Sequence, residues 1–238
     1  MRLCVIPARG GSKRIPRKNI REFCGKPMIS YSISAALDCG LFDKVMVSTD
    51  DEEIAEVASY FGADVPFLRS PGNSDDYAGT GDVMNEVISL YERRGLFFGV
   101  ACCIYATAPL ITVRRLQEAY TLFTQENYDV VFPVGKYSSS ILRSFKVVEK
   151  YAAVANFPEY VAKRSQDLCD MYFDAGQFYW IHPNKFKKLQ NKNIFGESKG
   201  VVILNDFEVQ DIDQFCDWKM AEFKYHYMQS SHPSEAEL

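Results

Sequence analysis

The sequence predicts an α/β fold in which helices flank a mostly parallel sheet. Short apolar runs alternate with amphipathic helical patterns over the first 134 residues, and glycines or capping residues separate them. The length of 238 residues and the apolar content of 47% suit a single domain with a sizeable core. In a sheet of this kind, ligands bind at the carboxyl ends of the strands.

The expected elements are separated by clear start and stop signals. Pro27 suits the first turn of a helix at 28–38 that ends at Gly40. Asp50 can cap the next helix, with Glu53 three residues later, and Gly62 ends it. We expect strands at 3–6, 45–47, 65–68, 100–105, 130–134, 175–181, 201–204 and 209–212, and further helices at 81–94, 112–126, 183–190 and before residue 228.

Residues 136–173 break this alternation, because they show no clean rhythm of helix and strand. We interpret them as an arm inserted into one domain that spans residues 1–228, followed by a polar tail at 229–238 that we expect to be disordered. A lone arm cannot bury its apolar residues, and such patches usually contact a partner. We therefore expect the arm to form a homodimer through Ile141, Leu142, Phe145, Val147, Val148, Val154 and Phe157.

Composition limits the class of partner and the compartment. The formal net charge of −4 argues against a general affinity for nucleic acid or for an anionic membrane. None of the apolar runs approaches the length of a membrane span, and the seven cysteines form no C-x-x-C pair or Cys/His cluster that would indicate zinc. We expect reduced thiols in a cytoplasmic protein.

The stretch 6–19 is the strongest functional signal. A short apolar strand runs into Gly10 and Gly11, which let backbone N–H groups approach a ligand because no Cβ blocks the way. The same loop carries five cationic side chains that can supply charge to phosphate oxygens, namely Arg9, Lys13, Arg14, Arg17 and Lys18. It matches neither the Walker pattern nor G-x-G-x-x-G. The loop predicts a nucleotide triphosphate site, and a solvated basic loop or a nucleic-acid patch is the alternative.

A second signal is the pair of carboxylates at Asp211 and Asp213. In a strand, these two residues face the same side while Ile212 points into the core. Two close carboxylates repel each other unless a cation lies between them, and Mg2+ completes its shell with water and phosphate oxygens. The same spacing also arises by chance or at the start of a helix, so its meaning depends on the basic loop.

The stretch 6–19 closely resembles the signature of cytidylyltransferases that activate eight- and nine-carbon sugar acids as CMP-sugars, and the resemblance extends over residues 1–228. It implies a Rossmann-like, GT-A-like nucleotidyltransferase fold. It also implies a reaction in which a sugar hydroxyl attacks the α-phosphorus of CTP and pyrophosphate leaves. In the resembled family the acidic pair binds Mg2+, and the members are dimers with a comparable arm near the partner's sugar site.

The resemblance implies roles for individual residues. Arg9 and Lys18 match positions that contact phosphates near the reacting centre, so the expected catalytic set is Arg9, Lys18, Asp211 and Asp213. The expected nucleotide-binding set is Ala8, Arg9, Gly10, Gly11, Ser12, Lys13, Lys18, Asn19, Arg69 and Thr80. By composition alone, the segment from Arg69 to Thr80 also fits an exposed turn. Either a second metal ion or Asp211 would help to deprotonate the attacking hydroxyl.

The sugar-binding region departs from the sialic-acid enzymes, which carry Gln, Ser and Arg where this chain has Tyr105, Ala108 and Ile111. Buried polar groups without partners are costly, so these changes favour a nine-carbon acid with fewer hydroxyls. The segments 164–168 and 174–180 look like those of pseudaminic acid cytidylyltransferases. We therefore expect sugar contacts from Tyr105, Thr107, Arg164, Gln166, Asp174, Gln177 and Phe178.

Several alternatives stay open at this point. Core packing would explain Tyr179 and Trp180, while Arg164 and Gln166 would fit a solvated surface of the arm. The same reaction on sialic, legionaminic or 3-deoxy-octulosonic acid is the nearest rival function. A nonenzymatic nucleotide sensor would keep the fold without turnover, which the intact catalytic set argues against. A nucleic-acid-binding protein would show salt-dependent binding to DNA.

Overall fold

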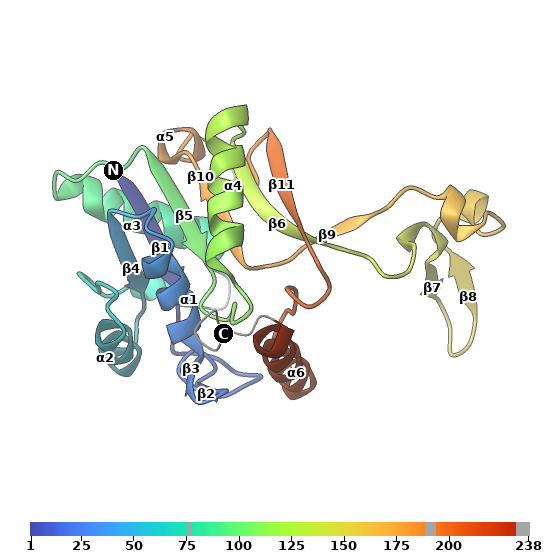
Figure 1. The fold of residues 1–238 in the computed structure, drawn as a ribbon, viewed down its shortest axis with the longest axis horizontal. Helices are drawn as coiled ribbons and strands as arrows, with labels where there is room; N and C mark the ends of the chain where they lie inside the picture. Colours follow the sequence, from blue (N-terminus) through green and yellow to red (C-terminus); the bar gives the residue numbers. More distant parts are fainter. Residues whose placement is uncertain (76–77, 189–193, 232–238) are drawn as a thin grey trace.

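The computed structural model describes residues 1–75, 78–188 and 194–231, and a seven-stranded sheet forms its centre within these ranges. The strands of the sheet are β1 (Arg2–Pro7), β4 (Lys44–Ser48), β5 (Val100–Ile104), β6 (Val130–Lys136), β9 (Tyr172–Asp174), β10 (Phe178–Ile181) and β11 (Lys199–Leu204). Their order is β11-β6-β10-β5-β1-β4, and β9 pairs with β6 (Figure 1). Outside the sheet, β2 (Glu22–Phe23) pairs with β3 (Lys26–Pro27), and β7 (Phe145–Val147) pairs with β8 (Ala153–Ala155).

The sheet is mostly parallel, as the sequence predicts. β1 lies between β4 and β5 and is parallel to both, and β11 is parallel to β6. β10 runs antiparallel between β5 and β6, so that Phe178 at its start pairs with Ile104 at the end of β5. The start of β10 therefore lies at the same edge of the sheet as the carboxyl ends of β1 and β5.

Helices cover both faces of the sheet, which confirms the predicted α/β class. They are α1 (Met28–Asp38), α2 (Glu52–Tyr60), α3 (Thr80–Arg93), α4 (Val113–Glu126), α5 (Pro183–Phe186) and α6 (Phe215–Ser231). Along β1, Cys4 and Ile6 belong to a buried cluster with α1, α2 and α4, whereas Leu3 and Val5 belong to a second cluster with α3 and α5. This division follows from the alternation of side chains along a strand. A third, smaller cluster joins the β2–β3 hairpin to α6.

Two local predictions near α2 are wrong. The segment 65–68 forms no strand: pairing with β4 stops at a bridge made by Asp64, and Pro66 has no N–H to donate to a ladder. The N-cap of α2 is Asp51 rather than Asp50, because the Asp51 carboxylate accepts a backbone N–H of the first turn at 3.0 Å. Asp50 instead contacts the loop after β1.

The predicted strand at 209–212 is also wrong, since this segment is irregular although its apolar residues are buried. The Lys224 side chain donates to the Val209 carbonyl, and the Lys18 side chain donates to the Ile212 carbonyl, both at 2.6 Å. Two lysine side chains thus satisfy the carbonyl groups that a neighbouring strand would otherwise bind.

The remaining differences concern where elements begin and end. The strand expected at 175–181 begins only at Phe178, as β10, because 175–177 form a turn in which Gly176 has a φ of 62°, which suits glycine, and β9 occupies the last residues of the segment expected to be the arm. α6 continues to Ser231, past the expected start of the tail. The last residues of the helix expected at 183–190, and residues 232–238 of the expected tail, lie outside the described residues.

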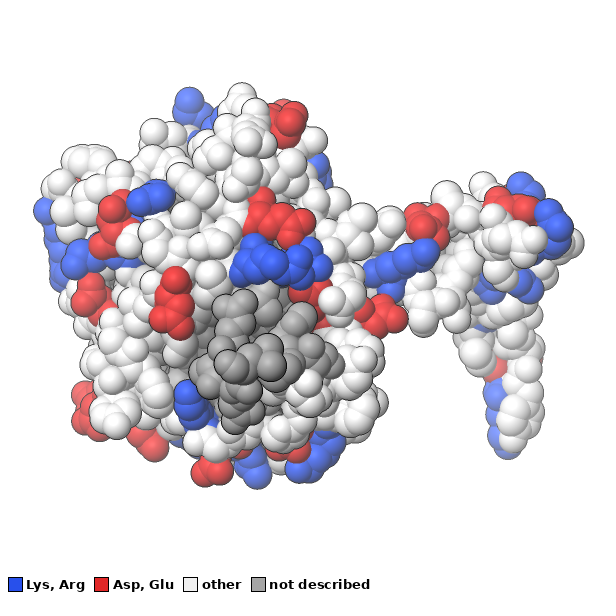
Figure 2. Space-filling view, viewed as in Figure 1, with Lys and Arg blue, Asp and Glu red and all other residues white. Residues whose placement is uncertain are grey.

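The arm leaves the sheet after β6 and returns in β9, whose pairing with β6 sets Tyr172 opposite Lys136. It carries the β7–β8 hairpin at its far end (Figure 1). The space-filling view shows that the arm stands clear of the body (Figure 2). Of the apolar residues expected to meet a partner, Ile141 and Leu142 are half-buried, while the exposed ones are Phe145, Val147, Val148, Val154 and Phe157. The arm therefore presents apolar surface that the rest of the chain does not cover.

The described residues contain no helix with the length and apolar character needed to cross a bilayer. All seven cysteines are free thiols, as the sequence suggests. Cys4 and Cys102 lie fully buried in the core, where desolvation raises the pKa of each thiol well above its ordinary value. These two side chains therefore act as small apolar residues.

Candidate active site

A cavity of about 460 Å³ opens at the carboxyl ends of β1 and β5. Its walls come from the loop after β1, the end of the segment after β4, the start of α3 and the residues after β5. It brings together Arg9, Ser12, Lys13, Lys18, Asn19, Arg69, Thr80, Tyr105 and Thr107 from the predicted site. Parts of the chain that are far apart in sequence thus meet where a parallel sheet is expected to bind its ligand.

Hydrogen bonds hold the loop after β1 beside this cavity. The Ala8 N–H donates to the Ser48 carbonyl at 2.9 Å, which extends the contact between β1 and β4. The Asn19 side chain, 7% exposed, donates to the Arg9 carbonyl at 2.9 Å. The Arg9 side chain lines the cavity, and its guanidinium donates to the Asp75 carbonyl at 2.8 Å. Ala8 and Asn19 therefore position the loop backbone, and Arg9 presents charge.

The two loop glycines have different surroundings. The Gly10 N–H donates to Asp50 Oδ1 at 2.9 Å, so it faces α2 rather than an incoming ligand. A Cβ added to Gly10 would lie 2.6 Å from Asp51 Oδ2, whereas one added to Gly11 would meet nothing within 4 Å. Asp51 is itself held, because it caps α2 and accepts two hydrogen bonds from Arg17. Gly10 is therefore required by close packing, while Gly11 leaves the backbone open.

The cationic side chains of the loop divide into two groups. Arg17 pairs with Asp51 and Glu53, so it ties the loop to α2 and does not line the cavity. Arg14 lines the cavity and forms an ion pair with Asp213 at 2.6 Å. The sequence shows that Arg14 is charged but does not identify Asp213 as its partner. The other cations that line the cavity are Arg9, Lys13 and Lys18.

Lys18 connects the basic loop to the acidic pair. Its ammonium group donates to the Ile212 carbonyl at 2.6 Å and lies 3.9 Å from Asp213 Oδ1. Burial lowers the pKa of Lys18, and the charges of Asp213 and Asp211 partly oppose this shift. The acidic pair therefore lies next to the edge of the cavity that Arg14 and Lys18 form.

Asp211 lies close enough to Asp213 to be affected by its charge. Desolvation raises the pKa of Asp211, and the negative charge of Asp213 raises it further. A divalent cation bound between the two carboxylates would remove this repulsion. Two carboxylates, with phosphate oxygens and water to complete the shell, are the donor set that Mg2+ takes. Among the described residues no third His, Cys, Asp or Glu joins this pair, so the two carboxylates suit a divalent cation that takes its other ligands from phosphate and water.

Arg69 provides a buried positive charge in the cavity wall, where it is 8% exposed. Its guanidinium donates to the Ser48 hydroxyl at 3.1 Å and also to the Ser48 carbonyl. Burial lowers the pKa of Arg69, whereas the carboxylates of Asp50 and Glu86 raise it. These contacts fix the guanidinium at the end of β4, and a side chain with both a charge and a fixed position is suited to recognise a nucleotide.

A pair of hydroxyl groups connects the two sides of the cavity. Thr80 Oγ1 and the Tyr105 hydroxyl lie 2.8 Å apart, and both residues line the cavity with Thr107. Behind Tyr105, the Tyr179 hydroxyl donates to Asp174 Oδ2 at 2.6 Å, and the two tyrosine rings lie 5.4 Å apart. Tyr179 is buried, as core packing predicts, but its hydroxyl also binds a residue of the predicted sugar site.

Other predicted sugar contacts lie away from this cavity. Phe178 is fully buried in the cluster under α1 and α4. Gln177, 3% exposed, donates its side-chain amide to the Glu208 carbonyl at 2.5 Å. Arg164 and Gln166 are exposed on the arm, where the Arg164 guanidinium pairs with a neighbouring carboxylate at 2.8 Å. The sequence motifs do not show which way these side chains point, because their orientation depends on the register of β10 and on the path of the arm.

The cytidylyltransferase family model matches residues 3–228 of this chain. The chain belongs to the cytidylyltransferase family. A pseudaminic acid cytidylyltransferase of Campylobacter jejuni is 42% identical over 223 residues, which are 94% of this chain and 95% of that protein. N-acylneuraminate cytidylyltransferase A of Danio rerio is 36% identical over 222 residues, which are 92% of this chain and 49% of that protein.

This cytidylyltransferase also shares its fold with a solved structure. CMP:2-keto-3-deoxy-manno-octonic acid synthetase in complex with CTP superposes with a TM-score of 0.68 at 18% identity, over 96% of this chain and 99% of that one. The nucleotidyltransferase fold that the family resemblance implies is therefore confirmed. The resemblance to pseudaminic acid cytidylyltransferases is confirmed along almost the whole chain.

Proposed function

We propose that this cytidylyltransferase transfers CMP from CTP to the anomeric hydroxyl of pseudaminic acid and releases pyrophosphate. The observation that carries the proposal is a cation-lined cavity in a chain 42% identical, over 94% of its length, to a pseudaminic acid cytidylyltransferase. Two pseudaminic acid cytidylyltransferases of Campylobacter jejuni, 42% and 41% identical to this chain, support pseudaminic acid as the substrate. Because the reaction consumes CTP, we assign it to the cytoplasm.

In this proposal the loop after β1 binds the triphosphate. As the sugar hydroxyl loses its proton to Asp211 or to water and forms its bond to the α-phosphorus, the bond to the bridging oxygen of pyrophosphate breaks, and negative charge builds on the leaving group. Such a reaction depends on positioning and charge neutralisation. Arg9, Lys13 and Lys18 supply the positive charge. Arg69 and Thr80, in the wall beyond the loop, hold the cytosine and ribose.

We assign Mg2+ to Asp211 and Asp213. When bound, the ion would neutralise phosphate oxygens and orient the triphosphate. In the structure, Arg14 and Lys18 balance the charge of Asp213. The Arg14 side chain is 66% exposed, so its ion pair is weak and its guanidinium can turn toward the phosphates.

We place the sugar next to Tyr105 and Thr107, which line the cavity. Asp174 contacts this part of the site indirectly, because it accepts a hydrogen bond from the Tyr179 hydroxyl. We further propose a homodimer in which the arm of one protomer brings Arg164 and Gln166 to the sugar site of the other. The projecting arm and its exposed apolar residues support this arrangement. Light scattering on a size-exclusion column should give the mass of a dimer, and a monomer at micromolar concentration would contradict the proposal.

A substrate panel tests the reaction. The protein is incubated with CTP, Mg2+ and one sugar acid at a time, and pyrophosphate is measured. We expect rapid release with pseudaminic acid, slow release with sialic, legionaminic or 3-deoxy-octulosonic acid, and none without a divalent cation. Faster release with one of the other acids would replace the sugar but keep cytidylyl transfer. No release with any acid would favour a nucleotide sensor.

A further inference from the structure

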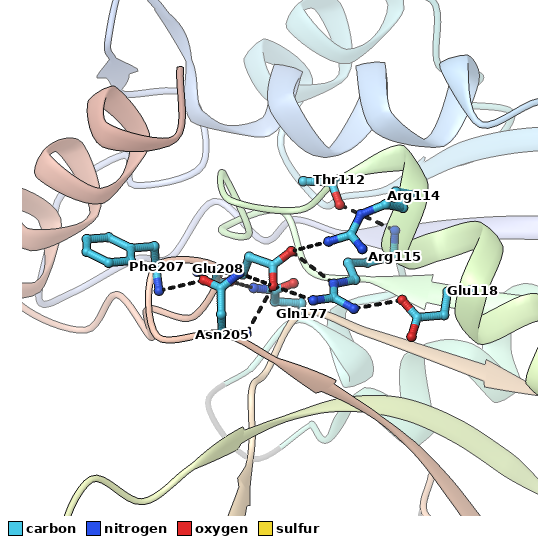
Figure 3. A network of polar contacts seen from close by, with 8 residues as sticks. All are labelled: Thr112, Arg114, Arg115, Glu118, Gln177, Asn205, Phe207 and Glu208. Atoms are coloured by element: carbon cyan, nitrogen blue, oxygen red, sulfur yellow. Dashed lines mark hydrogen bonds and ion pairs between the residues drawn. The ribbon is translucent and has the colours of Figure 1, made fainter. Parts of the chain in front are cut away.

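Glu208 is a buried carboxylate in the irregular segment between β11 and α6, three residues before Asp211. It is 4% exposed, and Arg115 of α4 binds it through two N–H groups, at 2.9 Å to Oε1 and 2.7 Å to Oε2 (Figure 3). The backbone and side-chain nitrogens of Asn205 also donate to Oε2, at 3.0 and 2.7 Å. Burial alone would raise the pKa of Glu208, but Arg115 and Asn205 hold it below its ordinary value.

The Glu208–Arg115 pair is better suited to set a position than to add stability. Desolvation of a buried ion pair offsets much of its attraction, so the net gain in folding free energy is small. Two parallel bonds between a guanidinium and a carboxylate nevertheless fix both distance and orientation. Because Leu116 and Phe123 are fully buried under the sheet, α4 is a firm base for this pair.

The backbone that follows Glu208 has little freedom. The Val209 carbonyl accepts a hydrogen bond from a lysine of α6 at 2.6 Å, and Ile212 is 1% exposed in the cluster against α6. The Asp213 N–H donates to the Asp217 carboxylate at 3.0 Å. A displacement at Glu208 would therefore be passed along a short, tethered segment to the acidic pair.

Glu208 also reaches the other side of the cavity through its backbone. Its carbonyl accepts the side-chain amide of Gln177 at 2.5 Å, and the Gln177 carbonyl accepts the Tyr105 N–H at 2.8 Å. Gln177 lies directly before β10, whose first residue pairs with the end of β5. One buried side chain thus joins the segment that carries the acidic pair to the backbone of the proposed sugar wall.

We propose that Glu208, held by Arg115, is a positioning residue that places Asp211 and Asp213 for the metal and, through Gln177, holds them in register with Tyr105. This inference rests on the proposed function, because only that function places the acidic pair and Tyr105 in the same reaction. It assigns no contact with substrate to Glu208. It also explains why Gln177 faces Glu208 instead of the cavity.

Glu208→Gln tests the inference, and Glu118→Gln is its matched control. Glu118 accepts a hydrogen bond from the same arginine at 2.7 Å but is 46% exposed and lies outside the site. Amide hydrogen exchange of residues 205–214 is measured without metal. The Mg2+ concentration for half-maximal pyrophosphate release is then measured at saturating CTP and sugar, and melting temperatures check folding.

We expect Glu208→Gln to speed exchange across 205–214 and to raise the half-maximal Mg2+ concentration about tenfold, as losses behind a metal site typically do. Glu118→Gln should stay within about twofold of wild type in both measurements, because exposed pairs contribute little. If Glu208→Gln does not fold, Arg115→Lys keeps the charge but loses the two-point contact, and it should shift both measurements in the same direction.

A lower melting temperature with unchanged exchange and unchanged Mg2+ dependence would mean that Glu208 only stabilises the fold, and would overturn the inference. Equal behaviour of Glu208→Gln and Glu118→Gln would do the same. Failure of the proposed function looks different. In that case wild type releases no pyrophosphate with any sugar acid, while hydrogen exchange still reports whether Glu208 holds the segment.

Discussion

Replacing Gly10 by alanine tests whether the phosphate loop is built against α2. The new Cβ would lie 2.6 Å from Asp51 Oδ2 and 3.0 Å from Asp51 Cβ, whereas ordinary contacts begin near 3.4 Å. Either the loop or Asp51 must therefore move by most of an ångström. Asp51 resists this movement, because it caps α2 and binds Arg17.

Both responses cost folding free energy. If Asp51 moves, α2 loses an N-cap worth about 1 kcal/mol. If the loop moves instead, overpacking costs about 1–3 kcal/mol. We expect Gly10→Ala to lower the free energy of unfolding by about 2 kcal/mol, and hence the melting temperature by about 4–8 °C for a chain of this size. Gly11→Ala meets nothing within 4 Å, so it should leave stability unchanged or raise it by about 0.4–1 kcal/mol.

Calorimetry of the two variants without CTP measures this difference, and steady-state kinetics measures its consequence. Because the displaced loop also misplaces Arg9, we expect Gly10→Ala to lower kcat/KM for CTP by about tenfold or more. Equal melting temperatures for Gly10→Ala and Gly11→Ala would refute the reasoning, since only Gly10 lies against Asp51. A normal kcat/KM with lowered stability would show that α2 yields and the loop does not.

Three further outcomes are expected. Asp211→Ala and Asp213→Ala should each cut turnover by orders of magnitude while circular dichroism stays native, and near-normal pyrophosphate release by both would remove the metal assignment. Tyr105→Gln should reduce the preference for pseudaminic over sialic acid by a larger factor than it raises the KM for CTP. The preference is measured as the ratio of the two kcat/KM values, and an unchanged ratio would contradict this prediction. Lys185 lowers the pKa of Asp129 to about 2. The stability due to Asp129 is therefore present above its unfolded pKa of about 3.9 and is lost as the pH falls toward 2, so the melting temperatures of wild type and Asp129→Asn should converge there.

The order of strands and helices is predictable from this sequence because most elements carry their own pattern. The continuous apolar run of β1 and the capping threonine of α4 are local signals, and both predict the observed element correctly. The segment 209–212 has an equally local pattern of apolar residues, yet it is not a strand. Its carbonyl groups are bound by Lys18 and Lys224, which are far away in sequence. A local pattern cannot report such tertiary partners.

The same limit applies to the candidate site. Residue type and sheet position predict that Arg9, Lys18 and Tyr105 gather at one edge, because the carboxyl ends of neighbouring strands converge there. They do not predict that the Gly10 N–H is taken by Asp50, since the cap of α2 could equally be either of two adjacent aspartates. Residue type and sheet position also do not predict that the Gln177 side chain binds the Glu208 carbonyl, because this contact depends on the antiparallel pairing of β10 with β5.

The attachment of the arm has a consequence for how such proteins can diverge. Lys136 and Tyr172 are paired neighbours on β6 and β9, so the chain leaves and re-enters the sheet at hairpin distance. A short turn in place of 137–171 would join the same two strands without moving the rest of the sheet. The arm can therefore lengthen, shorten or change its sequence while the loop after β1 stays as it is. In the proposed homodimer, the contact between subunits and the binding of the nucleotide can therefore be altered independently of each other in one chain.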